Sequence, residues 1–356
     1  MPRLENRARG MDTGRHSSSF HPHPPASLLT SLLRDVSRSF YLTLRALPGA
    51  IRPQIGLAYL LARTTDTIAD TDLVPLNLRL QALDALRVRI LNAGTHRLEF
   101  GELARQQGAA AERVLLERVE EALAALAALS SEDQARIRAV LETIISGQEL
   151  DLRRFAGQTE RIAALETDTD LDDYTYRVAG CVGEFWTKMC RAHLFPSAPL
   201  DDAFLLSHGV RFGKGLQLVN ILRDLPADLR KGRCYLPAKA LAAHGLTPDD
   251  LLLTASEPRL RPLYDSWLGT AQAHLAAGWD YTNALPRACV RVRLACAWPI
   301  LIGVRTLALL RQGPVLDASQ RIRVRRDEVR AWMLRSVALY PWLSAWQRLF
   351  TKAAAK

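Results

Sequence analysis

Cysteine is scarce in this sequence and is not clustered. The five cysteines include no CxxC pair, which excludes a zinc ribbon or a disulfide framework and favours a reducing compartment; they are Cys181, Cys190, Cys234, Cys289 and Cys296. No run of about 18 uninterrupted apolar residues is present, so we predict no membrane-spanning helix. The first residues also lack the apolar core of a secretion signal, and we therefore expect a cytoplasmic protein.

Histidine offers little metal or nucleophilic chemistry either. The histidines after the first 26 residues form no i, i+4 ligand pair; they are His96, His193, His208, His244 and His274. No Ser-His-Asp or Cys-His arrangement stands out, so a hydrolase triad has no support.

The charge is basic and unevenly placed. The 356 residues carry a formal net charge of +10, of which residues 311–356 hold +7, with eight Arg and two Lys against three acidic residues. A basic C-terminal end of this kind suits binding to a nucleic acid, a membrane surface or a phosphorylated cofactor, and a solubilising surface explains it as well. The share of charged residues, 24%, together with 48% hydrophobic residues, excludes a disordered polyelectrolyte and predicts a packed core.

The hydrophobic period is helical almost everywhere, and alternating strand patterns are nearly absent. Residues 1–26 have no such period and include the Pro-rich stretch His21 to Pro25, so we predict a disordered tail. The remainder, 27–356, is predicted to be one all-α domain with a basic amphipathic C-terminal segment. We expect helices near 28–46, 52–70, 75–93, 111–128, 132–155, 171–193, 201–223, 259–284, 287–311 and 327–349, with a helix start at Ser131 and loops near 156–168, 194–200, 225–236 and 312–320.

One expected helix carries a polar face with two carboxylates. In YLLARTTDTIAD (59–70) the spacings of 4, 3 and 4 place four side chains on one side; they are Tyr59, Arg63, Asp66 and Asp70. Two carboxylates at i and i+4 repel each other, and a hard divalent cation such as Mg²⁺ would compensate them. Taken alone, the pair is better explained as a solvated acidic face.

A second stretch repeats this arrangement. In GKGLQLVNILRDLPADLRKGRCYLP (213–237) the spacings of 3, 4 and 4 align Gln217, Asn220, Asp224 and Asp228. Basic side chains surround the pair, namely Arg223, Arg230, Lys231 and Arg233. Two acidic faces with guanidinium groups beside them suit a diphosphate held through Mg²⁺. Because Pro226 disfavours a helix at the preceding residue, we expect the helix to kink or end near Asp224, which leaves the reach of Asp228 open.

These segments, together with SRSF (37–40) and YTYRVAGCVG (174–183), resemble the squalene/phytoene synthase family of head-to-head prenyl transferases over roughly residues 28–340. The resemblance implies the all-α isoprenoid synthase fold, in which helices surround a central cavity and the two aspartate motifs face each other at its mouth. It also implies prenyl diphosphate substrates rather than a nucleic acid, and we expect a monomer.

The resemblance assigns roles residue by residue. It implies Mg²⁺, or Mn²⁺, on Asp66, Asp70, Asp224 and Asp228, and places Tyr174 near the reacting carbons. The implied diphosphate ligands are Arg38, Arg63, Arg223 and Arg233, with Ser39, Tyr59 and Tyr235 as hydroxyl partners. The implied walls of the prenyl tunnel include Phe40, Val178, Ala179, Gln217 and Asn220, of which Asn220 is also expected on the cofactor side.

The C-terminal part favours one branch of the family. CAWPILIGVRTLALL (296–310) followed by RIRVRRDEV (321–329) resembles the squalene synthase end, in which a basic pair matching Arg321 and Arg323 is associated with NADPH. Guanidinium groups suit the 2′-phosphate of that cofactor, although plain surface charge explains them as well. The implied activity joins two farnesyl diphosphates through presqualene diphosphate and reduces the product to squalene.

Two alternatives stay open. A phytoene, dehydrosqualene or hydroxysqualene synthase would keep both aspartate motifs and transfer no hydride, whereas a non-catalytic helical partner would only bind prenyl diphosphates or membranes. Departures from eukaryotic squalene synthases at Ala69, Thr71 and Arg177 weaken the assignment of the product.

Two further features have two interpretations each. Gly180 and Gly183 leave room either for a prenyl chain or for close contact between helices. In the segment 340–356 an apolar face carries Trp342, Leu343, Trp346, Leu349 and Phe350. That face could contact a membrane interface peripherally or dock onto the body of the protein.

Overall fold

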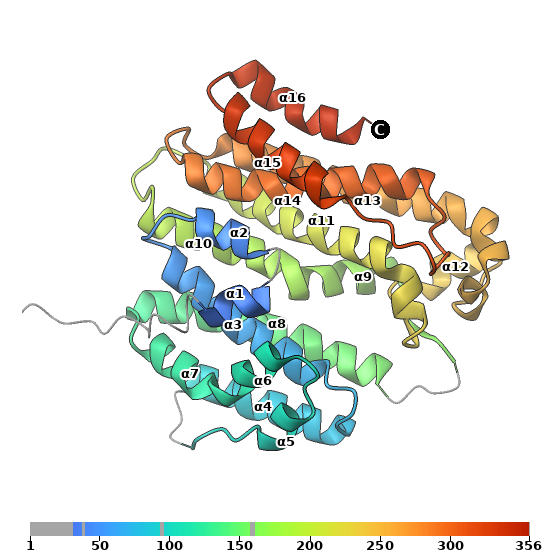
Figure 1. Ribbon diagram of the computed structural model, residues 1–356, viewed down its shortest axis with the longest axis horizontal. Helices are drawn as coiled ribbons and strands as arrows, with labels where there is room; N and C mark the ends of the chain where they lie inside the picture. Colours follow the sequence, from blue (N-terminus) through green and yellow to red (C-terminus); the bar gives the residue numbers. More distant parts are fainter. Residues whose placement is uncertain (1–30, 38–39, 93–95, 157–160, 356) are drawn as a thin grey trace, which may run out of the picture.

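The computed structural model describes residues 31–37, 40–92, 96–156 and 161–355 and is almost entirely helical, which confirms the predicted all-α class (Figure 1). In chain order its elements are α1 (Leu33–Ser37), α2 (Phe40–Ala46), α3 (Arg52–Ala69), α4 (Leu76–Asn92), α5 (Gly101–Arg105), α6 (Ala110–Glu117), α7 (Val119–Ala127), α8 (Ser131–Phe155), β1 (Ala163–Ala164), α9 (Asp168–Thr175), η2 (Tyr176–Gly180), α10 (Cys181–His193), α11 (Asp202–Leu229), β2 (Arg233–Cys234), α12 (Ala238–Ala243), η3 (Asp249–Leu252), η4 (Thr254–Ser256), α13 (Glu257–Ala284), α14 (Val290–Gln312), α15 (Arg326–Leu339) and α16 (Leu343–Ala354). The predicted tail, residues 1–26, lies outside the described residues.

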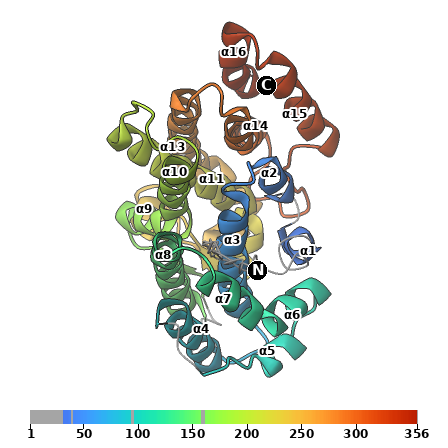
Figure 2. The same cartoon turned by 90° about the vertical axis from the view of Figure 1, so that its left-hand side faces the viewer.

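The long helices form two packed groups. One core is built mainly from α3, α4, α7, α8 and α10, and the other from α11, α13, α14 and α16. In Figure 1 α3, α4, α7 and α8 of the first group lie in the lower half, α10 lies at about the level of α11, and α15 and α16 lie above α14. Figure 2 shows α3, α8, α10 and α11 beside one another near the centre, where the two groups meet.

Local sequence explains how several helices begin. The Ser130 hydroxyl accepts a hydrogen bond from the Asp133 amide at 3.3 Å, so the cap of α8 is Ser130 and the expected start, Ser131, is the first helical residue. At α9 the side chains of Thr167 and Asp170 cap each other's backbone amides in a capping box. Both caps fix the chain where it enters a wall of the central cavity.

Helix α11 continues through Pro226 to Leu229, which corrects the predicted helix end near Asp224. The first residues of the predicted loop over 225–236 are therefore helical. Proline provides no amide for the carbonyl four residues earlier, which here belongs to Leu222. The Tyr264 hydroxyl of α13 donates to that carbonyl at 2.8 Å. Because this partner replaces the missing amide, Asp228 stays on the same helix one turn beyond Asp224.

Glycines allow α10 and α11 to cross in direct backbone contact. A Cβ atom added to Gly183 would lie 1.8 Å from the Gly209 carbonyl oxygen, and one added to Gly213 would lie 2.1 Å from that of Ala179. The helix-contact interpretation is therefore right for Gly183. A Cβ at Gly180 would meet side chains of Tyr176, Lys214 and Val210 at 3.1 to 3.3 Å.

Two predicted helices are each broken in two. The range 111–128 contains α6 and α7 with a break at Arg118, and 327–349 contains α15 and α16 with a break at Pro341. The range 28–46 contains α1 and α2, and the residues between them lie outside the described part of the chain. The short helix α5 and the two-residue parallel strands β1 and β2 were not predicted. The strand pair joins Ala163 to Arg233 and thereby anchors the segment after α11.

Helix α14 is long and apolar enough to cross a membrane by length and composition alone. In its most apolar window, however, 67% of the residues are buried inside the protein. Buried side chains such as Ala297, Ile300 and Leu301 belong to the core, so a role as a core helix explains the composition.

The C-terminal helix α16 docks onto the body. Trp346 and Leu349 are 1% exposed, and the Trp346 indole donates to Asn283 at 2.8 Å while stacking on Trp279. For this part of the apolar face, docking is the correct interpretation, and Trp346 and Leu349 do not face a membrane. Trp342, just before the helix, stays 62% exposed.

Candidate active site

A cavity of about 620 Å³ lies between the two helix groups, within the size range of small-molecule sites. Its walls come from α3, α8, α9, η2, α10, α11 and α14, and the segment at β2 closes one side. The predicted site residues that line it are Tyr59, Arg63, Asp66, Asp70, Tyr174, Val178, Ala179, Gln217, Asn220, Arg233 and Tyr235. Residues far apart in the sequence therefore converge on one chamber, as the isoprenoid synthase fold requires.

The chamber is polar at one end and apolar at the other. Along α3 the lining changes from Ile55 and Ala58 to Asp66 and Asp70 toward the C-terminus. Helix α8 changes in the same direction from Val140 and Ile144 to Gln148 and Asp151, and α11 from Gly209 and Phe212 to Gln217 and Asn220. Because the lining of all three helices changes in the same direction, the cavity has a charged mouth and an apolar interior, as an amphiphilic ligand requires.

The first aspartate pair lies at the charged end. Desolvation and the neighbouring Asp70 carboxylate raise the pKa of Asp66 to about 6, although an ion pair with Arg63 lowers it in part. Desolvation also raises the pKa of Asp70. Since desolvation disfavours the ionised form of both carboxylates, a bound cation would stabilise them as an ionised pair.

The second pair lies at the rim, on α11. Neither of its aspartates lines the chamber itself, and Arg223 binds the Asp224 carboxylate through two of its nitrogens. Desolvation and Asp224 raise the pKa of Asp228 to about 6. Arg223, a predicted diphosphate ligand, therefore neutralises one aspartate of the pair and leaves the other without such a partner.

Arg233 and Lys231 lie between the two acidic pairs. The Arg233 guanidinium is 3.7 Å from Asp151 and 3.6 Å from Asp72, and its side chain is only 16% exposed. The charges of Arg233 and Lys231 lower the pKa of Asp70 on one side and of Asp228 on the other, against the larger effect of desolvation. The mouth thus combines two acidic faces with shared cations, which is the chemistry of a metal-bound diphosphate.

Asp151 of α8 is a site residue that was not predicted. The Tyr235 hydroxyl donates to it at 3.0 Å, and the Tyr235 ring stacks on Tyr174 with centroids 4.8 Å apart. Desolvation raises the pKa of Asp151 to about 6, although Arg233 and the Tyr235 hydrogen bond lower it in part. Desolvation, with the nearby Tyr235 and Asp151, also raises the pKa of Tyr174 well above its usual value, so both phenols stay protonated. A chain of proton-bearing groups therefore leads from the cavity to a carboxylate.

A π-helical turn shapes the wall opposite α3. Residues Tyr176–Gly180 form η2, and a Cβ on Gly147 of α8 would lie 2.9 Å from the Arg177 Cβ. The close approach brings Val178 and Ala179 into the cavity lining. Arg177 is held by Asp173 and Ser146, at 2.7 and 2.9 Å, and does not line the cavity.

Several predicted residues lie elsewhere or outside the description. Arg38 and Ser39 fall outside the described residues, as does the side chain of Phe40. Arg321 and Arg323 are exposed, lie on the segment between α14 and α15, and do not line the cavity. In the described part of the chain they form no ion pair.

The acidic residues fit a divalent cation held in part by substrate. Among the described residues no three His, Cys, Asp or Glu side chains gather closely enough to hold a metal ion by themselves. Mg²⁺ commonly takes one or two carboxylates and completes its shell with waters and phosphate oxygens. Asp66 and Asp228 each have a raised pKa and a second aspartate one helical turn away, which matches that requirement.

Comparisons with known proteins agree with this geometry. The family model described as squalene/phytoene synthase matches residues 33–328. The chain is 31% identical to a presqualene diphosphate synthase of Rhodopseudomonas palustris and 32% identical to one of Zymomonas mobilis, over 71% and 70% of this chain and 77% and 73% of those proteins. It is 29% identical to a bifunctional lycopene cyclase/phytoene synthase of Phaeosphaeria nodorum, over 65% of this chain but only 37% of that longer protein.

Solved structures share the fold. The squalene synthase TcSQS with a bound ligand superposes with a TM-score of 0.73 at 22% identity, covering 93% of this chain and 91% of that one. The squalene synthase HpnC from Alicyclobacillus acidocaldarius gives 0.59 at 22% identity, over 82% and 96%. Because the family model matches most of the chain and a curated relative is 31% identical to it, the chain belongs to the squalene/phytoene synthase family of prenyltransferase-type enzymes.

Proposed function

We propose that the protein condenses two farnesyl diphosphates head to head to give presqualene diphosphate. The observation that supports this proposal is the single chamber of about 620 Å³, apolar along most of its length, with two acidic helix faces and shared cations at one end. Two prenyl chains would lie along the apolar walls while their diphosphates meet the charged mouth. Relatives named presqualene diphosphate synthase, 31% and 32% identical to this chain, favour that product.

Diphosphate binding would rely on cationic side chains that lie beside the acidic pairs. Arg63, Arg233 and Lys231 would bind phosphate oxygens, because Arg63 is paired with Asp66 and the charges of Arg233 and Lys231 act on Asp70. Mg²⁺ held by Asp66 and Asp70, and by Asp228 with Asp224, would neutralise the diphosphates and assist the departure of the leaving group. The residues thus hold the two charged groups together and keep the allylic carbons just inside the apolar part.

The carbon chemistry needs one ionisation and one proton loss. The C1–O bond of the donor breaks, which gives diphosphate and an allylic cation, and the 2,3 double bond of the acceptor forms a bond to that carbon. Loss of a proton from the same carbon closes the cyclopropane ring. The chain Tyr174, Tyr235 and Asp151 would take this proton, since a carboxylate with a pKa of about 6 can accept it near neutral pH. The Tyr174 ring face would also stabilise the cation.

A second candidate continues from presqualene diphosphate to squalene with NADPH. Two observations favour it, namely the exposed basic pair Arg321 and Arg323 and an alignment with the squalene synthase of Nicotiana benthamiana over 81% of this chain at 25% identity. Exposed guanidinium groups suit a phosphate of the cofactor. A family member that ends in phytoene, dehydrosqualene or hydroxysqualene would form its product without NADPH.

Product analysis tests the proposal. Purified protein is incubated with farnesyl diphosphate and Mg²⁺, with and without NADPH, and the extracts are dephosphorylated and analysed by gas chromatography and mass spectrometry. We expect presqualene alcohol in both reactions; squalene that appears only with NADPH would establish the second candidate. Farnesol alone, or no conversion, would contradict the proposal.

A matched pair of variants connects that product to the mouth. Asp66→Asn removes a carboxylate from the first acidic pair and should abolish turnover. Asp84→Asn makes the same change on α4, where the side chain is 59% exposed and pairs with Arg87, and should leave turnover unchanged. Equal activity of the two variants would refute the assignment of the acidic mouth.

A further inference from the structure

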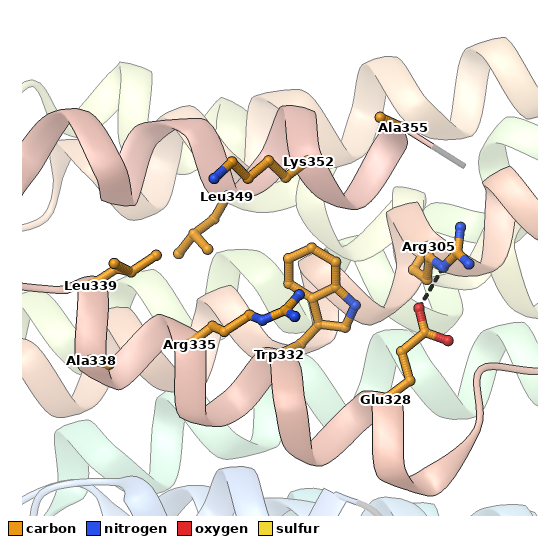
Figure 3. Close-up of a pocket in the computed structure, with 9 residues that line it drawn as sticks. All are labelled: Arg305, Glu328, Trp332, Arg335, Ala338, Leu339, Leu349, Lys352 and Ala355. Carbon is orange, nitrogen blue, oxygen red and sulfur yellow. Dashed lines mark hydrogen bonds and ion pairs between the residues drawn. The ribbon is translucent and has the colours of Figure 1, made fainter.

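A second cavity, of about 500 Å³, lies between α14, α15 and α16 and shares no lining residue with the central chamber. We name it the C-terminal groove and define it by Arg305, Glu328, Trp332, Arg335, Leu349 and Lys352. Figure 3 shows Arg305 and Glu328 at one end, the Trp332 ring in the middle, and Leu339 at the other end. The proposed reaction assigns no role to these residues.

The groove is cationic. Arg305 pairs with Glu328 at 2.5 Å, yet its Nη1 atom is buried and has no hydrogen-bond partner among the described residues. In the described part of the chain Arg335 and Lys352 form no ion pair, and the Arg335 guanidinium lies 5.5 Å from the centre of the Trp332 ring. Three cationic side chains against one carboxylate leave a net charge of +2, which an anion would balance.

The groove also has an apolar end. Trp332 is 7% exposed and Leu349 is 1% exposed, so both belong to its floor, and Leu339 lies at the end away from Arg305 (Figure 3). The chain turns just beyond Leu339, and there Trp342 and Leu343 remain 62% and 52% exposed. Exposed tryptophan side chains are enriched at the membrane interface.

We propose that the C-terminal groove binds the anionic headgroup of a membrane phospholipid. The phosphate lies against Arg305, Arg335 and Lys352, and the first carbons of the lipid chains follow the floor toward Leu339. A fully soluble anion would use the cations but leave the apolar end and the exposed turn without a role. The net charge of +7 over residues 311–356 adds attraction to an anionic lipid surface.

Vesicle binding tests this proposal independently of turnover. The full chain is sedimented with vesicles of phosphatidylcholine containing phosphatidylglycerol, and with vesicles of phosphatidylcholine alone. The double variant Arg335→Gln/Lys352→Gln removes the two groove cations that have no ion pair. The control Arg330→Gln/Arg348→Gln removes two exposed charges from the same helices outside the groove. Thermal unfolding monitored by circular dichroism checks that both variants fold.

We expect binding that depends on phosphatidylglycerol and falls about 30-fold in the groove variant, because each basic residue near an anionic surface contributes about a factor of five. The control should bind more tightly than the groove variant, because its two charges lie outside the groove and make no direct contact with the headgroup. Equal losses in both variants would show a diffuse basic surface, and binding independent of phosphatidylglycerol would show that the headgroup charge is irrelevant; either result overturns the proposal. So would complete displacement from the vesicles by millimolar inorganic phosphate at constant ionic strength, because the groove would then be a site for free phosphate.

Discussion

Replacement of Gly183 by alanine should separate the two helices that form one wall of the central chamber. The added Cβ would lie 1.8 Å from the Gly209 carbonyl oxygen, whereas an ordinary carbon–oxygen contact is about 3.3 Å. Helices α10 and α11 would therefore have to move apart by about 1.5 Å at this crossing. Such overpacking reduces the free energy of unfolding by about 1–3 kcal/mol, and the contact here is backbone against backbone, so we expect the upper part of that range.

Gly269→Ala is the matched control. Gly269 also lies inside a long helix, α13, but a Cβ there meets nothing within 4 Å. Removing a helical glycine without a clash raises the free energy of unfolding by about 0.5–1 kcal/mol. The two variants should thus differ by about 3 kcal/mol in urea unfolding followed by circular dichroism, and Gly183→Ala should also lose turnover because Gly183 and Gly209 both line the chamber. A Gly183→Ala protein as stable as Gly269→Ala would refute the close crossing.

Two further changes test separate parts of the account. Burial raises the pKa of Asp151 from 3.8 to about 6, so the stability that this group contributes is present below pH 4 and is lost as the pH rises through 6. The shift corresponds to a decline of about 3 kcal/mol in the free energy of unfolding between pH 4 and pH 7. Asp151→Asn should abolish that part of the decline, as measured by urea unfolding, whereas an unchanged pH dependence would refute the burial. Tyr264→Phe leaves the Leu222 carbonyl without a donor and should reduce the free energy of unfolding by about 1–3 kcal/mol; no loss would show that the carbonyl beside Pro226 has another partner.

The fold class and the longest helices could be predicted because their apolar period is strong and local. The expected helix over 52–70 differs from α3 by one residue, and the one over 259–284 differs from α13 by two. Single ranges hid breaks at Arg118 and Pro341, where the period continues although the chain turns. A proline usually ends a helix, but Pro226 does not, because Tyr264 compensates from a different helix. That compensation joins residues 42 positions apart and has no signal in the local sequence.

The candidate site was predictable where spacing alone places side chains on one helix face. Asp66 and Asp70 line the cavity mouth from α3 as the i, i+4 pattern suggests. Asp151 could not be found in this way, because no other acid lies three or four residues from it on α8 and its partner Tyr235 lies 84 positions away. The only available signal was that α8 carries its polar residues toward the same end as α3. The cofactor role of Arg321 and Arg323 stays a prediction.

The most direct test of the central claim is a crystal structure with the unreactive analogue farnesyl thiodiphosphate and Mg²⁺. The account predicts a diphosphate between Asp66 on α3 and Asp228 on α11, in contact with Arg233, and a prenyl chain that runs inward past Phe212. A diphosphate bound away from both aspartate pairs, or a prenyl chain outside the chamber, would contradict it.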